Sequence, residues 1–159
     1  MTYHESIISQ YQSALAMLKQ TVDKCPNDIW NCPNDKGKFW QIAYHALFFT
    51  HLYLQDSIDT FTAWSKHRGE YENIGRVQTG EPYSREDVLE FLTFCQNQVT
   101  EKVANVVLDA ASGFHWLPFN KLELQLYNIR HLSQHTGELM DRVGTRAGVE
   151  IDWVSRQPK

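Results

Sequence analysis

Residues 38–65 read KFWQIAYHALFFTHLYLQDSIDTFTAWS, and this stretch decides the fold of the chain. Apolar and aromatic side chains occur around almost the whole circumference of a helix drawn through it, so no wide polar face is left for solvent. A helix that is apolar nearly all round is buried by neighbours on several sides. The stretch therefore predicts one long helix over about 38–65, placed in the middle of a helical bundle.

Three further segments carry the periodicity of about 3.6 residues that is typical of amphipathic helices. They are predicted over about 2–24, 84–111 and 120–143. Each begins at a side chain that can accept a hydrogen bond from the first helical turn: Thr2, Ser84 and Asn120. Thr2 and Glu5 have the spacing of a capping box, and Gly144 is the expected end of the last helix.

The apolar stripes of these helices predict part of the core. The first helix presents Ile7, Tyr11, Leu15, Leu18 and Val22 at helical spacing, and the third presents Val88, Leu92, Cys95, Val99, Val103 and Val106. No segment shows the strict alternation of a half-buried strand. The stripes therefore favour helix-on-helix packing and an all-α fold.

Residues 67–82 contain three glycines and a proline without helical periodicity, which predicts a long connection. Such a connection carries a chain across a bundle rather than around a tight hairpin. We therefore predict a four-helix bundle with a long crossover between its second and third helices. We expect one domain over 1–159, with a C-terminal tail over 144–159 whose Trp153 packs back onto the body.

The composition excludes several classes of protein. Lys+Arg 15 against Asp+Glu 19 gives a formal net charge of −4, which disfavours binding to nucleic acid or to anionic lipid. No apolar run is long enough to span a membrane, and the first residues do not have the pattern of a signal peptide. The three cysteines, Cys25, Cys32 and Cys95, lack the spacing of a disulfide framework. We expect a cytoplasmic protein.

The repeated Cys-Pro-Asn-Asp string at 25–28 and 32–35 is interpreted as a loop. Two nearby cysteines invite a zinc site, but structural zinc normally takes four ligands in Cys pairs separated by about two to four residues. The spacing here is wider, so we favour the loop.

The sharpest chemical feature is the pair His131 and His135 in the last predicted helix. Residues four apart lie on the same side of a helix and about one turn apart, so both imidazoles can bind one ion. Neither histidine falls on the charged stripe that faces solvent, and a desolvated imidazole needs a hydrogen-bond or metal partner. The pair therefore predicts a metal site that still needs a third ligand.

The second helix offers two histidines as that ligand, His45 and His51. They are six residues apart and point in different directions, so one site cannot use both. Periodicity does not choose between them. His45 lies with the few polar residues of its helix and could be exposed, whereas His51 lies nearer its apolar residues and could be a hydrogen-bonded core histidine.

Two segments resemble the DinB-like superfamily: FWQIAYHALFF at 39–49 and NIRHLSQHTGEL at 128–139. Members of that superfamily are four-helix bundles with a long crossover, a histidine after a tryptophan in the second helix, and a late His-x₃-His. The resemblance implies that His45, His131 and His135 bind one divalent metal ion, Zn or Ni. It also implies a homodimer.

Three imidazoles leave coordination positions open for water or substrate, as in catalytic metal sites. Such a metal ion lowers the pKa of a bound water or thiol. Glu138, one turn after His135, could orient a ligand or move a proton, although an ordinary surface glutamate is the simpler interpretation. Tyr127 and Asn128 are candidates for lining the binding pocket.

Characterised DinB-like proteins include transferases that use low-molecular-weight thiols. The resemblance therefore implies a metal-dependent thiol S-transferase, or a hydrolase, acting on a small molecule. The alternative is a non-enzymatic dimeric bundle that binds a ligand or a partner. The sequence itself names neither the substrate nor the native metal.

Overall fold

The computed structural model describes residues 1–75 and 80–156, and this part of the chain is helical, without a β-strand. The helices are α1 (Tyr3–Lys24), α2 (Asn27–Trp30), α3 (Phe39–Tyr53), α4 (Arg85–Asn105) and α5 (Lys121–Ala147). Two short 3₁₀ turns, Ile58–Thr60 and Gly69–Tyr71, lie between α3 and α4. The prediction of an all-helical fold is confirmed. Parts of the predicted crossover (76–79) and tail (157–159) lie outside the described residues.

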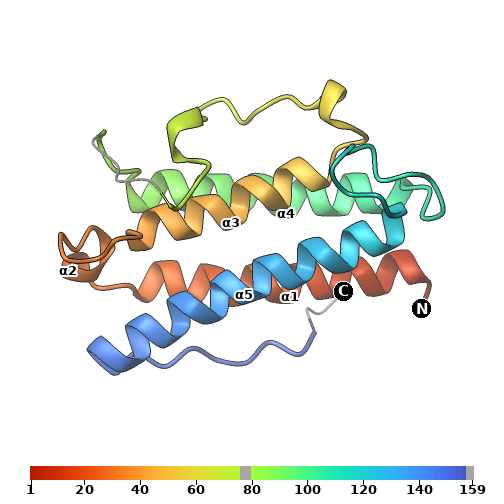
Figure 1. The fold of residues 1–159 in the computed structure, drawn as a ribbon. Helices are drawn as coiled ribbons and strands as arrows, with labels where there is room; N and C mark the ends of the chain where they lie inside the picture. Colours follow the sequence, from red (N-terminus) through yellow and green to blue (C-terminus); the bar gives the residue numbers. More distant parts are fainter. Residues whose placement is uncertain (76–79, 157–159) are drawn as a thin grey trace.

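The long helices lie side by side in a bundle (Figure 1). Both α1 and α3 pack against α4 and α5. Figure 1 shows that α3 and α4 run in the same direction and that α5 runs opposite to α3. Because α3 and α4 are parallel, the chain between them must return along the length of the bundle. Of this connection, residues 54–75 pass over α3.

The predicted core stripes are buried. Every named residue of the α1 stripe is less than 9% exposed. The same holds in α4 for Val88, Leu92, Cys95, Val99 and Val103, whereas Val106 is only half-buried. Every residue of α3 except Phe49 is buried. The nearly all-round apolar character of this segment therefore does place it in the interior, as predicted.

The predicted N-terminal caps are also present. Thr2 and Glu5 form a capping box on α1, and Ser84 and Asp87 form one on α4. The side chain of Asn120 accepts a hydrogen bond from the backbone N–H of Glu123 at the start of α5. Each cap occupies N–H groups that the first helical turn leaves unpaired.

The second predicted helix is shorter than expected, because α3 ends at Tyr53 and not near Ser65. The ammonium group of Lys121, at the start of α5, donates to the carbonyl oxygens of Gln55 and Asp56 at 3.0 and 2.6 Å. A continued helix would use those oxygens internally. The N–H of Ile58 instead donates to the carbonyl of Gly113, so tertiary contacts redirect the chain.

The third predicted helix also ends early, at Asn105 and not near Ala111. The backbone N–H groups of Lys121 and Leu122 donate to the carbonyls of Ala110 and Leu108. These donors belong to the first turn of α5, where a helix has no internal acceptors for them. The loop before α5 therefore serves as its cap, and this requires residues 106–120 to be non-helical.

The last helix is longer than predicted and ends at Ala147. Gly144 is helical, and Gly148 is the residue that ends α5, with a φ of 63° that suits glycine. The following tail lies along α1, where Gln20 exchanges hydrogen bonds with the backbone of Asp152. Trp153 is nevertheless 79% exposed, so its side chain does not pack onto the body as expected.

The expected loop after α1 contains one helical turn, α2, which sequence reasoning missed. Lys38 stabilises the remainder of this loop by donating to the carbonyls of Cys32, Pro33 and Asp35. Within the described ranges, no helix is long and apolar enough to cross a membrane.

Gly113 provides a test of the contact between the loop before α5 and the connection that follows α3. Its φ is 87°, and a side-chain Cβ there would overlap the carbonyl oxygen of Asp56. We expect Gly113→Ala to lower the free energy of unfolding by about 2–4 kcal/mol. The control is Gly137→Ala, because nothing lies within 4 Å of an added Cβ on that helical residue. It should stabilise the protein by about 0.5–1 kcal/mol in the same urea titration. Equal effects of both changes would contradict the tight contact.

Candidate metal centre

Three imidazoles from two helices meet between α3 and α5. His45 lies on α3, and His131 and His135 lie one turn apart on α5. One possible ligand atom of each lies within 4.8 Å of the others, and Nε2 of His45 is 3.2 Å from Nε2 of His131. Elsewhere in the described chain, no group of three or more His, Cys, Asp or Glu side chains comes as close. The cluster could hold a metal ion.

The structure separates the two histidines of α3 between which periodicity could not choose. His51 is only 2% exposed, and its ring lies against those of Phe61 and Phe94, at centroid distances of 5.3 and 4.9 Å. Its Nε2 donates to the carbonyl of Thr62 at 3.0 Å, and its Nδ1 accepts from Gln55 at 3.2 Å. Both of its nitrogens therefore have protein partners. His51 is a hydrogen-bonded core histidine, and His45 is the third member of the cluster.

The partners outside the cluster orient two of the rings. His45 Nδ1 donates to the carbonyl oxygen of Glu72 at 2.5 Å, because a carbonyl can only accept. His135 Nδ1 lies 3.2 Å from Oε2 of Glu138. With protons on these Nδ1 atoms, the Nε2 lone pairs of both rings are left for a cation. This is the outer-contact pattern that metal-binding histidines usually show.

His131 completes the donor set differently. Its Nδ1 is buried and has no hydrogen-bond partner among the described residues. Burial, and then the nearby His135 and His45, lower the pKa of His131 to about 4. Burial also lowers the pKa of His45, partly opposed by the hydrogen bond to Glu72. Both rings are therefore neutral near pH 7, as imidazole ligands must be. The set fits a divalent ion that accepts nitrogen ligands.

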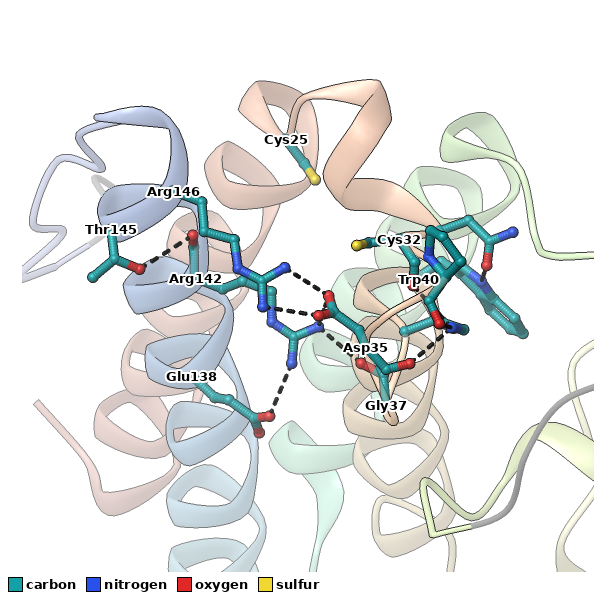
Figure 2. A network of polar contacts seen from close by, with 12 residues as sticks. Cys25, Cys32, Asp35, Gly37, Trp40, Glu138, Arg142, Thr145 and Arg146 are labelled. Carbon is teal, nitrogen blue, oxygen red and sulfur yellow. Dashed lines mark hydrogen bonds and ion pairs between the residues drawn. The ribbon is translucent and has the colours of Figure 1, made fainter.

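A chain of charged groups links Glu138 to the loop between α2 and α3 (Figure 2). Oε1 of Glu138 lies 3.4 Å from Arg142, which lies 3.3 Å from Asp35 on that loop. Arg146 adds two hydrogen bonds to Asp35 at 2.8 and 2.9 Å. The hydrogen bond from Arg146, aided by the charge of Arg142, lowers the pKa of Asp35. The predicted catalytic residue Glu138 thus touches His135 on one side and Arg142 on the other.

The connection between α3 and α4, called the crossover, holds His45 through the carbonyl of Glu72. Oε1 of Glu72 lies 2.9 Å from Nε2 of His67, and Nδ1 of His67 is hydrogen-bonded to the hydroxyl of Tyr44. The residue that presents its carbonyl to His45 is therefore tied by its side chain to α3. Sequence reasoning missed Glu72, and no side-chain motif could have found it because its contact to the cluster is made by the backbone.

The two residues predicted to line the pocket lie in different places. Tyr127 is half-buried, one turn before His131 on α5, with its ring centroid 5.7 Å from that of Tyr53. Asn128 is fully buried, and its amide donates to the carbonyl of Thr50 at 3.1 Å. Tyr127 is therefore connected to the cluster by ring contacts through Tyr53 and Phe49, whereas Asn128 is part of the interior between helices.

The comparisons of this chain with protein-family models, curated proteins and solved structures give no match. The resemblance carried by residues 39–49 and 128–139 therefore stays a prediction. What can be concluded about the site comes from its own geometry.

The contact between Glu138 and His135 can be tested by metal affinity. We expect Glu138→Gln to weaken Zn²⁺ binding about 10–100-fold, because the ring loses a charged partner that fixes its orientation. The control is Glu123→Gln on the exposed face of the same helix. Competition with a chromophoric chelator measures both. Equal affinities for the two variants would exclude a role of Glu138 in orienting His135.

The Asp35 interactions predict a pH dependence. We expect Asp35→Asn to lower the free energy of unfolding by about 1 kcal/mol at pH 7, because its partners are partly exposed. The pKa of Asp35 is lower in the folded chain than in the unfolded chain. This stabilisation is therefore complete above the ordinary Asp pKa of about 3.9 and is lost as the pH falls through the folded value. In urea titrations, the free energies of unfolding of the wild type and Asp35→Asn should become equal in acid. A constant difference would contradict the ion pairs.

Proposed function

We propose that this helical bundle is a four-helix bundle of the DinB-like type that binds one Zn²⁺ or Ni²⁺ ion through His45, His131 and His135. The observation that carries the proposal is the convergence of three imidazoles within 4.8 Å, with the Nδ1 atoms of His45 and His135 held from outside. Three nitrogen ligands leave positions open for a substrate, unlike a closed structural site.

We further propose that the site transfers a low-molecular-weight thiol to a small molecule, or hydrolyses one. A bound divalent ion would lower the pKa of a thiol or of water and favour the attacking anion. The histidines of this chain hold the ion in their neutral form, and Glu138 fixes the ring of His135. Oε2 of Glu138 lies at Nδ1 of His135, on the far side of the ring from Nε2, so Glu138 acts on the bound ion through this ring.

A second candidate function is non-enzymatic binding of a ligand or a partner. A cavity of about 270 Å³ lies between α1, α5 and the tail, and Ala14, Met17 and Met140 are among its lining residues. The histidine cluster is not part of this cavity. Trp153, which is 79% exposed, stands at its edge, and in the expected homodimer a second copy would cover this side chain. A bundle that binds through this cavity would not need the metal.

The metal content of protein purified without a polyhistidine tag tests the first proposal. We expect close to one Zn or Ni per chain, and none in His131→Ala/His135→Ala. His45→Ala should also lose the metal, whereas the matched change His51→Ala in the same helix should keep it.

Two results would contradict the proposal. Metal-free protein that takes up no added ion would leave the non-enzymatic candidate. Loss of metal in His51→Ala but not in His45→Ala would show that the cluster is not the site. Circular dichroism of each variant checks that the helices remain.

A further inference from the structure

Aromatic side chains continue from the histidine cluster along the contact between α3 and α5. Phe49 lies one turn after His45, and its ring centroid is 5.4 Å from that of His131. Tyr53 lies one turn further, 5.7 Å from Phe49 and 5.7 Å from Tyr127. Because α3 and α5 are antiparallel, residues after His45 meet residues before His131. The cluster and these rings therefore form one continuous row.

The row reaches the loop before α5. The rings of Phe119 and Tyr127 are 5.8 Å apart, and Nε1 of Trp116 lies 3.4 Å from the hydroxyl of Tyr53. We call Phe49, Tyr53, Tyr127, Phe119 and Trp116 the aromatic row.

The aromatic row is not simply core. Phe49 is the one residue of α3 that is not buried. Tyr127 and Phe119 are half-buried, and Trp116 is 43% exposed, whereas Tyr53 is buried beneath them at 4% exposure. Adjoining, partly exposed aromatic side chains are a common feature of binding surfaces. Their continuity with His131 places such a surface directly beside the candidate metal ion.

Arg130 supplies a charge next to the aromatic row. Its guanidinium lies 5.4 Å from the ring centroid of Tyr127. It has no hydrogen bond or ion pair to any described residue, whereas Arg142 and Arg146 on the same helix are paired with carboxylates. A cation fixed over a ring without an acidic partner is complementary to an anionic ligand group.

We propose that the aromatic row is the substrate platform of the metal site and that the substrate is a small aromatic carboxylic acid. The reacting group lies at the ion, the ring stacks beside Phe49 and Tyr127, and the carboxylate reaches Arg130. One helical turn separates Tyr127 from His131, about 6 Å along the axis, which is close to the length of one benzene ring. This proposal rests on the proposed function, because it requires a metal ion at the three histidines.

Three hydroxamic acids test it on the Zn²⁺-loaded full chain: acetohydroxamic, benzohydroxamic and 4-carboxybenzohydroxamic acid. All three chelate the ion, the second adds a ring, and the third adds a carboxylate. Affinities are measured by calorimetry in the wild type, Tyr127→Ala, Tyr127→Leu and Arg130→Gln. Leu126→Ala is the control, since Leu126 precedes Tyr127 on α5 and is 57% exposed.

We expect Tyr127→Ala and Tyr127→Leu to reduce the preference for benzohydroxamic over acetohydroxamic acid about 2–10-fold, the effect of one aromatic contact. Arg130→Gln should reduce the further preference for the carboxylated compound about threefold or more, and Leu126→Ala should change neither. Affinity for acetohydroxamic acid should stay the same throughout, which shows that each variant keeps its fold and its ion.

The failures are distinguishable. If acetohydroxamic acid binds but the preferences are the same in wild type and variants, the platform is wrong and the metal site stands. If no hydroxamic acid binds because the chain holds no ion, the proposed function fails and the platform fails with it.

Discussion

The antiparallel packing of α3 against α5 is the constraint on which the rest of the structure depends. Since α3 is buried on every side except at Phe49, the polar atoms of His45 can be satisfied only by neighbouring protein groups or by an ion. The Glu72 carbonyl takes one nitrogen, and the histidines of α5 face the other. Burying an imidazole against two others costs free energy, because its nitrogen lone pair has no partner unless the three rings share a cation or a proton.

Two connections outside these helices hold the cluster in place. The crossover presents Glu72 to His45, and the loop between α2 and α3 presents Asp35 to Arg142, which also contacts Glu138. Each contact fixes the ring that it reaches, because a hydrogen bond at Nδ1 sets both the tautomer and the direction of Nε2. The long connections thus position the site as much as the helices do.

Sequence reasoning predicted what local patterns encode. The caps at Thr2, Ser84 and Asn120, the core stripes of α1 and α4, and the pairing of His131 with His135 all follow from spacing within one helix. The ends of α3 and α4 could not be predicted in this way. The carbonyls that follow each helix accept hydrogen bonds from Lys121 and the first amides of α5, which are distant in the sequence or lie beyond a loop. For the same reason periodicity could not choose His45 over His51: the choice depends on which neighbour each one faces.

The central claim is that one divalent ion is bound by three imidazoles and keeps an open position. X-ray absorption spectroscopy of the chain loaded with one equivalent of Zn²⁺ tests it most directly. The account predicts three imidazole nitrogens at about 2.0–2.1 Å and one further light atom, without sulfur. A sulfur shell near about 2.3 Å, pointing to the cysteines, or a single imidazole would contradict it.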